Sequence, residues 1–402
     1  MVRPLKSAHV SDNARGYGRW LWLRGVVWLG LLLGGGQLFR ADESQGNGGL
    51  AGSASCRECH ADFHEKWATS LHGLTVRPYS RATGSQALEL PAGEFQVGDE
   101  RFRVGLESGH MVSWAGGREV SYPMEQMVGG RDVIYFLTRL QGGRLQVLPL
   151  GYDVRRREWF DISASTVRHF VESAVERVDW RAPGYTFNAA CYGCHVSHGQ
   201  HRYHPAEDRL EAVWQEPGIS CEACHGPAEA HVRLSRSQPA GAKLADWGII
   251  GLRGLSAECG DSLCATCHGK LRPISRQFTP GDRLLDHFDV VGLEDLDFGA
   301  DGRDRGETYT YAGWRMNRCA LAGELSCLHC HTSSGRYRFP EANANAACLP
   351  CHAERVANAP AHTRHAAGST GNRCVACHLP RREFARMRSE EHTSELQSPN
   401  TI

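Results

Sequence analysis

The sequence predicts a mainly α-helical protein with much irregular structure, into which one β-rich subdomain is inserted. Two observations predict this fold class. A Cys-x-x-Cys-His pentapeptide occurs seven times, and short helical pieces alternate with polar loops between most of its copies. The long interval between the first and second copies instead alternates apolar and polar residues between glycine pairs, which is typical of short antiparallel strands.

Length and composition exclude several classes of protein. The chain has 402 residues, of which 45 are basic and 45 acidic, so its formal net charge is zero. This length suggests two or three domains. The balanced charge argues against nucleic acid as a partner, because nucleic-acid-binding proteins usually carry a basic excess. Charged residues at 22% and hydrophobic residues at 41% exclude wholesale disorder, and no stretch is apolar enough for a multi-span membrane protein.

Residues 1–41 are typical of an export signal. Arginine and lysine residues precede an uncharged run from Gly25 to Phe39. This run is shorter than the roughly 20 residues that a helix needs to cross a bilayer. We expect a cleaved signal peptide, with a retained N-terminal membrane anchor as the alternative. In both cases the rest of the protein is expected in the periplasm or on the extracellular face.

The cysteines follow a single pattern. Fourteen of the sixteen belong to the repeated pentapeptide. Its copies are Cys56-Arg-Glu-Cys59-His60, Cys191-Tyr-Gly-Cys194-His195, Cys221-Glu-Ala-Cys224-His225, Cys264-Ala-Thr-Cys267-His268, Cys327-Leu-His-Cys330-His331, Cys348-Leu-Pro-Cys351-His352 and Cys374-Val-Ala-Cys377-His378.

This pentapeptide is the attachment motif of c-type haem. Thiols three positions apart lie on one side of a helical turn, where they can form thioethers with the two vinyl groups of one porphyrin. The histidine that follows the second cysteine then ligates the iron. We therefore predict seven covalently attached haem c groups, with the seven motif histidines as proximal ligands.

Other interpretations of the cysteines explain less. Zinc ribbons use Cys-x-x-Cys pairs but do not require a histidine after each, and a thioredoxin-like centre needs one motif only. A disulfide framework would suit an exported chain but would not repeat this spacing. Cys259 and Cys319 lie outside the motifs; they either bridge each other or are buried free thiols.

The motifs divide the chain into segments. Residues 42–89 are the first haem-binding segment, residues 90–160 the β-rich subdomain and residues 161–387 a domain with six haems. Within the subdomain we expect strands at Glu94–Val97, Arg101–Leu106, Met111–Trp114, Glu119–Tyr122, Val133–Leu140 and Arg144–Leu150. Beyond it, Ser165–Val178 is a candidate helix, and residues 234–256 are expected to form a long surface excursion.

Residues 388–402 are expected to be foreign to the natural protein. Arg388 to Ser398 reads RSEEHTSELQS, which resembles the conceptual translation of a sequencing adapter. A genuine polar tail is the alternative.

Low-spin haem iron needs a second axial ligand, which is usually methionine or histidine. Met111, Met124, Met127 and Met316 are the main methionines available, whereas twelve histidines besides the seven motif ligands lie between residues 42 and 387, so mostly bis-histidine haems are expected. The distal candidates are His72, His231, His365, His287, His169 and His198. For His287 and His169 a structural role is an equal alternative, and His198 competes with the neighbouring His201 and His204. His64 and His110 are better explained as structural residues.

Three segments resemble the multihaem cytochromes related to cytochrome c-554 and c-552. They are the first motif followed by Trp67, Ser70 and His72, the stretch Ser220–His231, and the stretch Arg373–Pro380. The resemblance implies that His72, His231 and His365 are distal ligands. Leu379 departs from the methionine that relatives often have there. Members are mainly electron carriers, although hydroxylamine-oxidising and nitrite-reducing enzymes share their haem packing.

The main hypothesis is an exported heptahaem protein that transfers electrons to or from redox partner proteins that the sequence does not identify. The alternative is an oxidoreductase of the nitrite or hydroxylamine type with one open haem. Nitrite-reducing relatives replace one motif histidine by lysine, whereas all seven motifs here keep histidine. A third hypothesis is a partner-binding scaffold that docks through the β-rich subdomain. No catalytic residue is predicted.

Overall fold

The structure is a computed structural model. It describes residues 49–89, 93–130, 132–165, 178–239, 242–275, 277–295, 309–323, 325–339 and 341–379, with short pieces at 298–299, 302, 304, 381–384 and 389–392. The expected signal segment 1–41 and most of the candidate helix Ser165–Val178 lie outside these residues. By their contacts, Gly48–Ile402 form one unit, so the predicted segment boundaries within it stay predictions.

The prediction of a mainly helical fold is wrong. Of the described residues, 39% are in helices and 24% in strands, and the strands form several sheets. Helices contribute less than expected because several motif helices end at the motif histidine, as in α7 (Tyr192–His195), α8 (Cys221–His225) and α16 (Cys374–His378). Strand pairs also form between the motifs, outside residues 90–160.

Four strands form an antiparallel meander, in the order β2 (Phe95–Val97), β3 (Glu100–Gly105), β4 (His110–Ala115) and β5 (Arg118–Pro123). The turn between β4 and β5 contains Gly116 and Gly117, both with positive φ, which is the backbone that a tight hairpin requires. Alternate residues of β3 and β4 are buried, so the meander has one apolar face.

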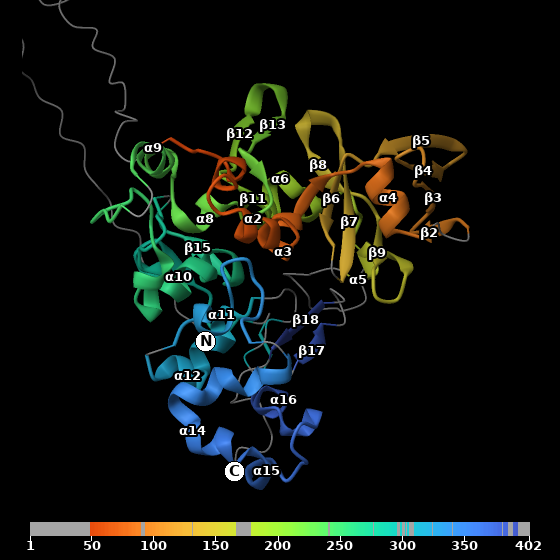
Figure 1. Cartoon of the computed structure of the whole chain (residues 1–402). Coiled ribbons are helices and arrows are strands. Elements are labelled where there is room, and N and C mark those ends of the chain that lie inside the picture. Colours follow the sequence, from red (N-terminus) through yellow and green to blue (C-terminus); the bar gives the residue numbers. More distant parts are fainter. Residues whose placement is uncertain are drawn as a thin grey trace, which may run out of the picture. The chain divides into compact units, whose positions relative to one another are not determined.

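A second sheet has six strands, in the order β1 (Val76–Pro78), β6 (Gln126–Gly129), β7 (Val133–Arg139), β9 (Leu150–Asp153) and β10 (Glu158–Asp161), with β8 (Leu145–Val147) also paired to β7. An apolar core joins strands of both sheets, and Phe102, Phe136 and Leu150 are fully buried in it. Figure 1 shows both sheets together at one side of the described chain. The strand β1 comes from residue 76, so this sheet is not confined to residues 90–160.

The same core explains most of the methionines. Met111, Met124 and Met127 are all buried in it. They pack against aromatic and aliphatic side chains of the two sheets. We therefore assign these three methionines to the β core rather than to haem iron.

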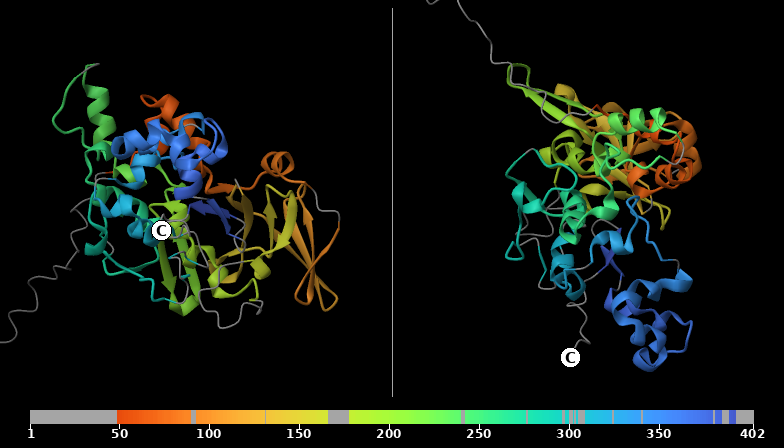
Figure 2. Two further views of the ribbon diagram at one scale, coloured as in Figure 1. Left: turned by 90° about the horizontal axis from the view of Figure 1, so that it is seen from below. Right: turned by 60° about the vertical axis from the view of Figure 1, so that its left-hand side comes forward.

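The remaining elements lie outside the two larger sheets, and several of them carry motif residues (Figures 1 and 2). The helices are α1 (Ser53–Cys56), α2 (Ala61–Ala68), α3 (Leu71–Leu74), α4 (Arg81–Ala87), α5 (Ile162–Ser165), α6 (Phe187–Ala190), α9 (Glu229–Ser237), α10 (Ala257–His268), α11 (Tyr311–Met316), α12 (Arg318–Leu321), α13 (Cys327–Cys330), α14 (Leu349–Ala357) and α15 (Ala359–Thr363). The 3₁₀ helices are η1 (Gln141–Gly143), η2 (Pro183–Tyr185), η3 (Pro205–Glu207), η4 (Leu252–Gly254), η5 (Leu284–Asp286), η6 (Glu341–Cys348) and η7 (Thr370–Asn372). Antiparallel strand pairs are β11 (Val196–Ser197) with β14 (Glu216–Pro217), β12 (Gln200–His204) with β13 (Arg209–Val213), β15 (Leu271–Pro273) with β16 (Phe288–Val290), and β17 (Arg381–Phe384) with β18 (Ser389–His392).

No helix in the described part of the chain is both long and apolar enough to cross a membrane.

A buried glutamate anchors the start of the described chain to the third motif. The carboxylate of Glu222, which lies within α8, accepts hydrogen bonds from the backbone N–H groups of Ala51 (2.8 Å), Gly52 (2.9 Å) and Ala228 (2.8 Å). Glu222 is only 1% exposed. A single side chain thus fixes the backbone before α1, which leads into the first motif, and the backbone before α9, which follows the third motif.

We expect Glu222→Ala to lower the free energy of unfolding by about 3 kcal/mol or more, because several buried N–H groups lose their acceptor at about 1–3 kcal/mol each. The shift of the urea midpoint measures this. The matched control is Glu94→Ala, which removes an exposed ion pair with Arg101 and should cost less than about 1 kcal/mol. Equal shifts for the two variants would contradict the anchoring role.

Candidate haem-binding sites

The motifs adopt the helical turn that attachment requires. In the first motif, the N–H groups of Cys59 and His60 both donate to the Cys56 carbonyl, at 3.3 and 2.9 Å. The second motif has the same Cys194–Cys191 bond at 3.2 Å, and in the fifth the His331 N–H donates to Cys327 at 2.9 Å. This turn places the two thiols of a motif on one side, with the histidine directly after them.

Three motif histidines face a second histidine. The ring centroids are 6.4 Å apart for His60 and His231, 6.5 Å for His268 and His72, and 6.1 Å for His378 and His362. Two imidazoles that each bind one metal ion at about 2.0 Å from opposite sides would have centroids about 6.3 Å apart. Each of these three ring pairs joins one motif histidine to one histidine outside the motifs. The spacing therefore fits two axial ligands of one iron.

Backbone carbonyls accept hydrogen bonds from Nδ1 of two of these paired rings and of the motif histidine His225. Nδ1 of His72 lies 3.0 Å from the carbonyl oxygen of Ser333, and Nδ1 of His231 lies 3.0 Å from that of Trp247. Nδ1 of His225 lies 2.8 Å from the carbonyl oxygen of Ile250. A carbonyl can only accept, so Nδ1 carries the proton and Nε2 keeps a lone pair. Metal-binding histidines are oriented in this way.

The ring of His268 lies near three other histidines. It has accessible surface, yet it lies deep in the protein, where burial lowers its pKa to about 4 and His72, His331 and His195 act in the same direction. Burial also lowers the pKa of His72, against the opposite effect of its bond to Ser333. Both rings are therefore neutral near pH 7, and neutral imidazole is the form that ligates iron. Accessible surface at depth, beside several histidines, is what a cavity for a large flat cofactor requires.

Cysteines of different motifs lie side by side. The first cysteines of two motifs are close neighbours in three cases: Cys56 with Cys221, Cys264 with Cys327, and Cys348 with Cys374. Second cysteines meet in one case, Cys194 with Cys267. The helices that carry them are also in contact: α1 with α8, α10 with α13 and with α7, and α16 with η6.

Further cysteine neighbours connect the motifs into one branched series. Cys224 lies near Cys264 and Cys267, and Cys330 lies near Cys348. The fourth motif, which ends α10, therefore neighbours the second, third and fifth motifs. The first and seventh motifs lie at the ends of the series, and Cys59 and Cys377 in them are exposed.

The structure places the other predicted ligands differently. His365 is exposed, and its ring lies over Gly371. His287 contacts Asp282 (3.3 Å) and the ring of Phe278, and the exposed His198 has a positive φ of 52°. His169 lies outside the described residues. His362, which packs against His378 from α15, was not among the predicted ligands.

Alternative uses of the cysteines gain no support. In the described part of the chain no disulfide joins two cysteines, so neither a disulfide framework nor a bridge between Cys259 and Cys319 is seen there. Cys319 instead lies near Cys330 and Cys348. Burial raises the pKa of Cys224 to about 12, whereas the contact with Cys56 lowers the pKa of Cys221 in the same motif to about 7. In the described part of the chain, no three His, Cys, Asp or Glu side chains converge as a metal-ion cage would need.

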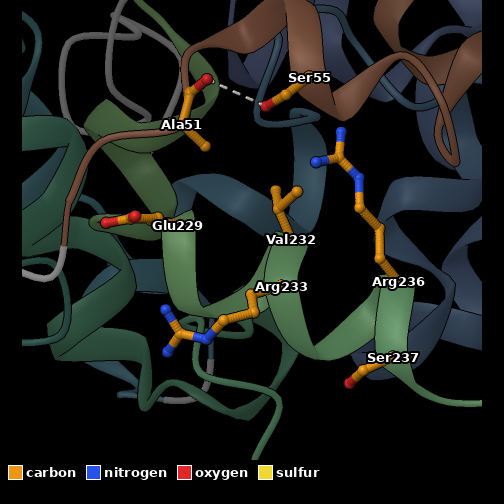
Figure 3. A pocket seen from close by; sticks show the side chains of 7 residues that line it. All are labelled: Ala51, Ser55, Glu229, Val232, Arg233, Arg236 and Ser237. Carbon is orange, nitrogen blue, oxygen red and sulfur yellow. Dashed lines mark hydrogen bonds between the residues drawn. The ribbon is translucent and has the colours of Figure 1, made fainter.

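A pocket of about 480 Å³ adjoins the first motif. Ala51 and Ser55 line it from the segment before Cys56, and the helix α9, which also carries His231, supplies the rest of the lining. Figure 3 shows Val232 and Arg236 projecting from α9 toward the segment that carries Ser55. Arg236 also pairs with Glu58 of the motif at 2.7 Å.

Comparisons with known proteins agree with this geometry. Residues 162–226, which include the second and third motifs, match the family described as cytochrome c554 and c-prime. The crystal structure of the outer cell wall cytochrome OcwA covers 87% of this chain and 79% of its own, with a TM-score of 0.52 and 16% sequence identity. The resemblance to multihaem c-type cytochromes is confirmed.

At this identity the likeness is one of fold. An undecahaem cytochrome from the S-layer of Carboxydothermus ferrireducens covers 82% of this chain and 51% of its own, at 16% identity and a TM-score of 0.42. None of the curated proteins matches the chain. The multihaem cytochrome fold, the motif turns and the facing histidines together make the donor set suitable for haem c.

Proposed function

We propose that the chain is an exported electron-transfer protein with seven covalently attached haem c groups, most of them ligated by two histidines. The observation that carries this proposal is the set of three His–His ring pairs, at the spacing of two axial ligands and each with a motif histidine. Haem c, when bound, supplies one-electron redox chemistry at its iron.

The cysteines and the histidines of the chain would hold these haem groups in different ways. The fourteen motif cysteines form the thioethers, and His60, His195, His225, His268, His331, His352 and His378 are the proximal ligands. We assign the distal positions opposite His60, His268 and His378 to His231, His72 and His362. His362 takes the place that the sequence had predicted for His365. The carbonyls of Trp247 and Ser333 orient the His231 and His72 rings.

The contacts between the motifs support electron transfer through the protein rather than a reaction at one haem. Neighbouring motifs are in direct contact, so the chain holds its cofactors close together without any large movement of the protein. The fourth motif is enclosed, whereas cysteines of the first, sixth and seventh motifs are exposed, namely Cys59, Cys351 and Cys377. Redox partner proteins would then approach the ends of the series.

Two features favour low-potential electron carriage over catalysis. Histidines on both sides of the iron would leave no open coordination position at three of the motifs. Three methionines that could have supplied higher-potential ligation are buried in the β core. Export rests on the basic segment before Gly25 and on the need to attach c-type haem outside the cytoplasm.

The test is a haem count combined with a spectrum. We expect seven haems per chain by pyridine haemochrome assay and intact mass, and a reduced spectrum that changes little when carbon monoxide is added. Five or fewer haems, in protein matured with a full attachment system, would contradict the proposal. Carbon monoxide binding by a substantial fraction of the haems would instead favour an oxidoreductase with an open site.

A further inference from the structure

The same hydrogen bond joins three pairs of motifs. In each pair, a side-chain oxygen three residues before the first cysteine of the earlier motif accepts the backbone N–H of the first cysteine of the later motif. Ser53 Oγ accepts from Cys221 at 3.2 Å, Asp261 Oδ1 from Cys327 at 2.7 Å, and Asn345 Oδ1 from Cys374 at 2.8 Å. The three acceptors differ in chemistry, but their position relative to the motif is identical.

Helical geometry explains the position of the acceptor. Ser53 and Cys56 share α1, and Asp261 and Cys264 share α10, so each oxygen lies on the same helix face as the cysteine one turn later. Asn345 and Cys348 share the 3₁₀ helix η6, in which residues three apart eclipse each other. The face that presents the first thiol of a motif therefore also presents the oxygen.

The start of a helix explains why the backbone N–H of the later motif's first cysteine is the donor. The helices α8, α13 and α16 begin at Cys221, Cys327 and Cys374. The first N–H groups of a helix have no acceptor within that helix. The oxygen of the partner motif supplies the missing acceptor, and in doing so brings the two first cysteines into contact.

The second motif uses the same position for another purpose. Asn188 lies three residues before Cys191, but its Oδ1 accepts from the Leu145 N–H of β8, and its Nδ2 donates to the Gly143 carbonyl, each at 3.0 Å. This asparagine attaches the second motif to the six-stranded sheet. The second motif contacts the fourth motif through the second cysteine of each, Cys194 and Cys267.

We propose that Ser53, Asp261 and Asn345 are positioning residues that hold the cofactors of six motifs as three close pairs. The pairs are 56–60 with 221–225, 264–268 with 327–331, and 348–352 with 374–378, and the motif 191–195 is left outside them. This inference rests on the proposed function, in which every motif carries haem. The free thiols of the structure stand for the thioether sulfurs of the mature protein.

Close pairing has a spectroscopic signature. Two haems held near each other at a fixed angle couple their Soret transitions, which gives a two-signed band in circular dichroism. Unfolding or loss of haem reduces absorbance and dichroism together, whereas a shift within one pair changes the two-signed band alone. The band therefore separates a positioning role from a merely structural one.

The cleanest test is at Asp261, in a background that removes its second partner. Oδ2 of Asp261 accepts from Trp314 Nε1 at 2.6 Å, and Trp314→Phe removes that bond while it keeps the bond to Cys327. In the Trp314→Phe background, Asp261→Asn retains an oxygen for the Cys327 N–H and Asp261→Ala does not. We expect the two-signed band to fall by roughly one third in the alanine variant, because one of three pairs is altered, and to persist in the asparagine variant.

Asn345 provides a second test at a partly exposed site, should the buried Asp261→Ala variant fail to fold. Asn345→Ala should reduce the band to a similar extent. Thr363→Val is its control, because the Thr363 hydroxyl bonds to Asn372 Oδ1 and not to the motif. All variants should keep the haem count of the parent. An unchanged band in Asn345→Ala with all haems attached would overturn the pairing role, whereas a low haem count in the unaltered protein would overturn the proposed function instead.

Discussion

Replacing Cys264 and Cys267 together by serine should prevent accumulation of folded protein, and not merely remove one haem. These cysteines end α10, whose residues Asp261, Leu263 and Ala265 are buried. The motif neighbours the second, third and fifth motifs, so an empty site there would open a cavity among three other cofactors. A large-to-small change in a core already costs about 2–5 kcal/mol, against a total stability of about 5–15 kcal/mol for a domain.

The seventh motif provides the matched control. Cys374→Ser with Cys377→Ser removes a motif at the end of the series, where Cys377 is exposed and α16 contacts η6 and η7. We expect a folded protein that lacks a single haem. Periplasmic yield, intact mass and thermal melting compare the two variants. Equal yields, each with one haem fewer than the parent, would show that the fourth motif is not central.

The strands of the two larger sheets were largely predictable, because alternation and glycine turns are local signals. Expected segments such as Met111–Trp114 and Val133–Leu140 correspond to β4 (His110–Ala115) and β7 (Val133–Arg139). The sequence missed β1, β9 and β10 of the six-stranded sheet, and also β6 (Gln126–Gly129), which has four residues and no alternation. It also missed β12 and β13, because their polar residues looked like a loop that contains a cluster of histidines.

The helical content was overestimated for a physical reason. A haem motif needs one turn of helix, so each copy suggested a helix, but nothing in the motif requires the helix to continue. Five-residue helices such as α8 and α16 satisfy the attachment geometry. The chain between them is free to pair as short strands, and it does so in β15 and β16.

The sequence predicts attachment residues from a local motif, whereas it does not indicate which motifs are neighbours in the structure. A motif is local, but the bonds that organise the motifs join residues far apart in the chain. Ser53 and Cys221 are separated by 168 positions, and Asp261 and Cys327 by 66. Single serine, aspartate and asparagine residues carry no signal of such a partner. Only the recurrence at three positions before a cysteine could have drawn attention to them.

The distal ligand that we propose for the seventh motif differs from the one that the family resemblance implies. Two histidines, His362 and His365, lie three residues apart, and the family resemblance implied the second. In the structure α15 ends at Thr363, and Arg364 then takes a positive φ of 60°, which turns His365 away from the direction of the helix. His362 stays on α15 and lies parallel to His378, with an angle of 11° between the rings.

His362→Ala should therefore convert about one haem in seven to a high-spin form that binds carbon monoxide, because the iron of the seventh motif loses its distal ligand. Covalent attachment through Cys374 and Cys377 should be unaffected, so the haem count stays constant. His365→Ala is the matched control and should leave the spectrum low-spin. Electron paramagnetic resonance and the carbon monoxide difference spectrum measure both variants. The opposite result, with a high-spin haem in His365→Ala alone, would restore the ligand implied by the family resemblance and show that the His362–His378 ring pair is not a ligand pair.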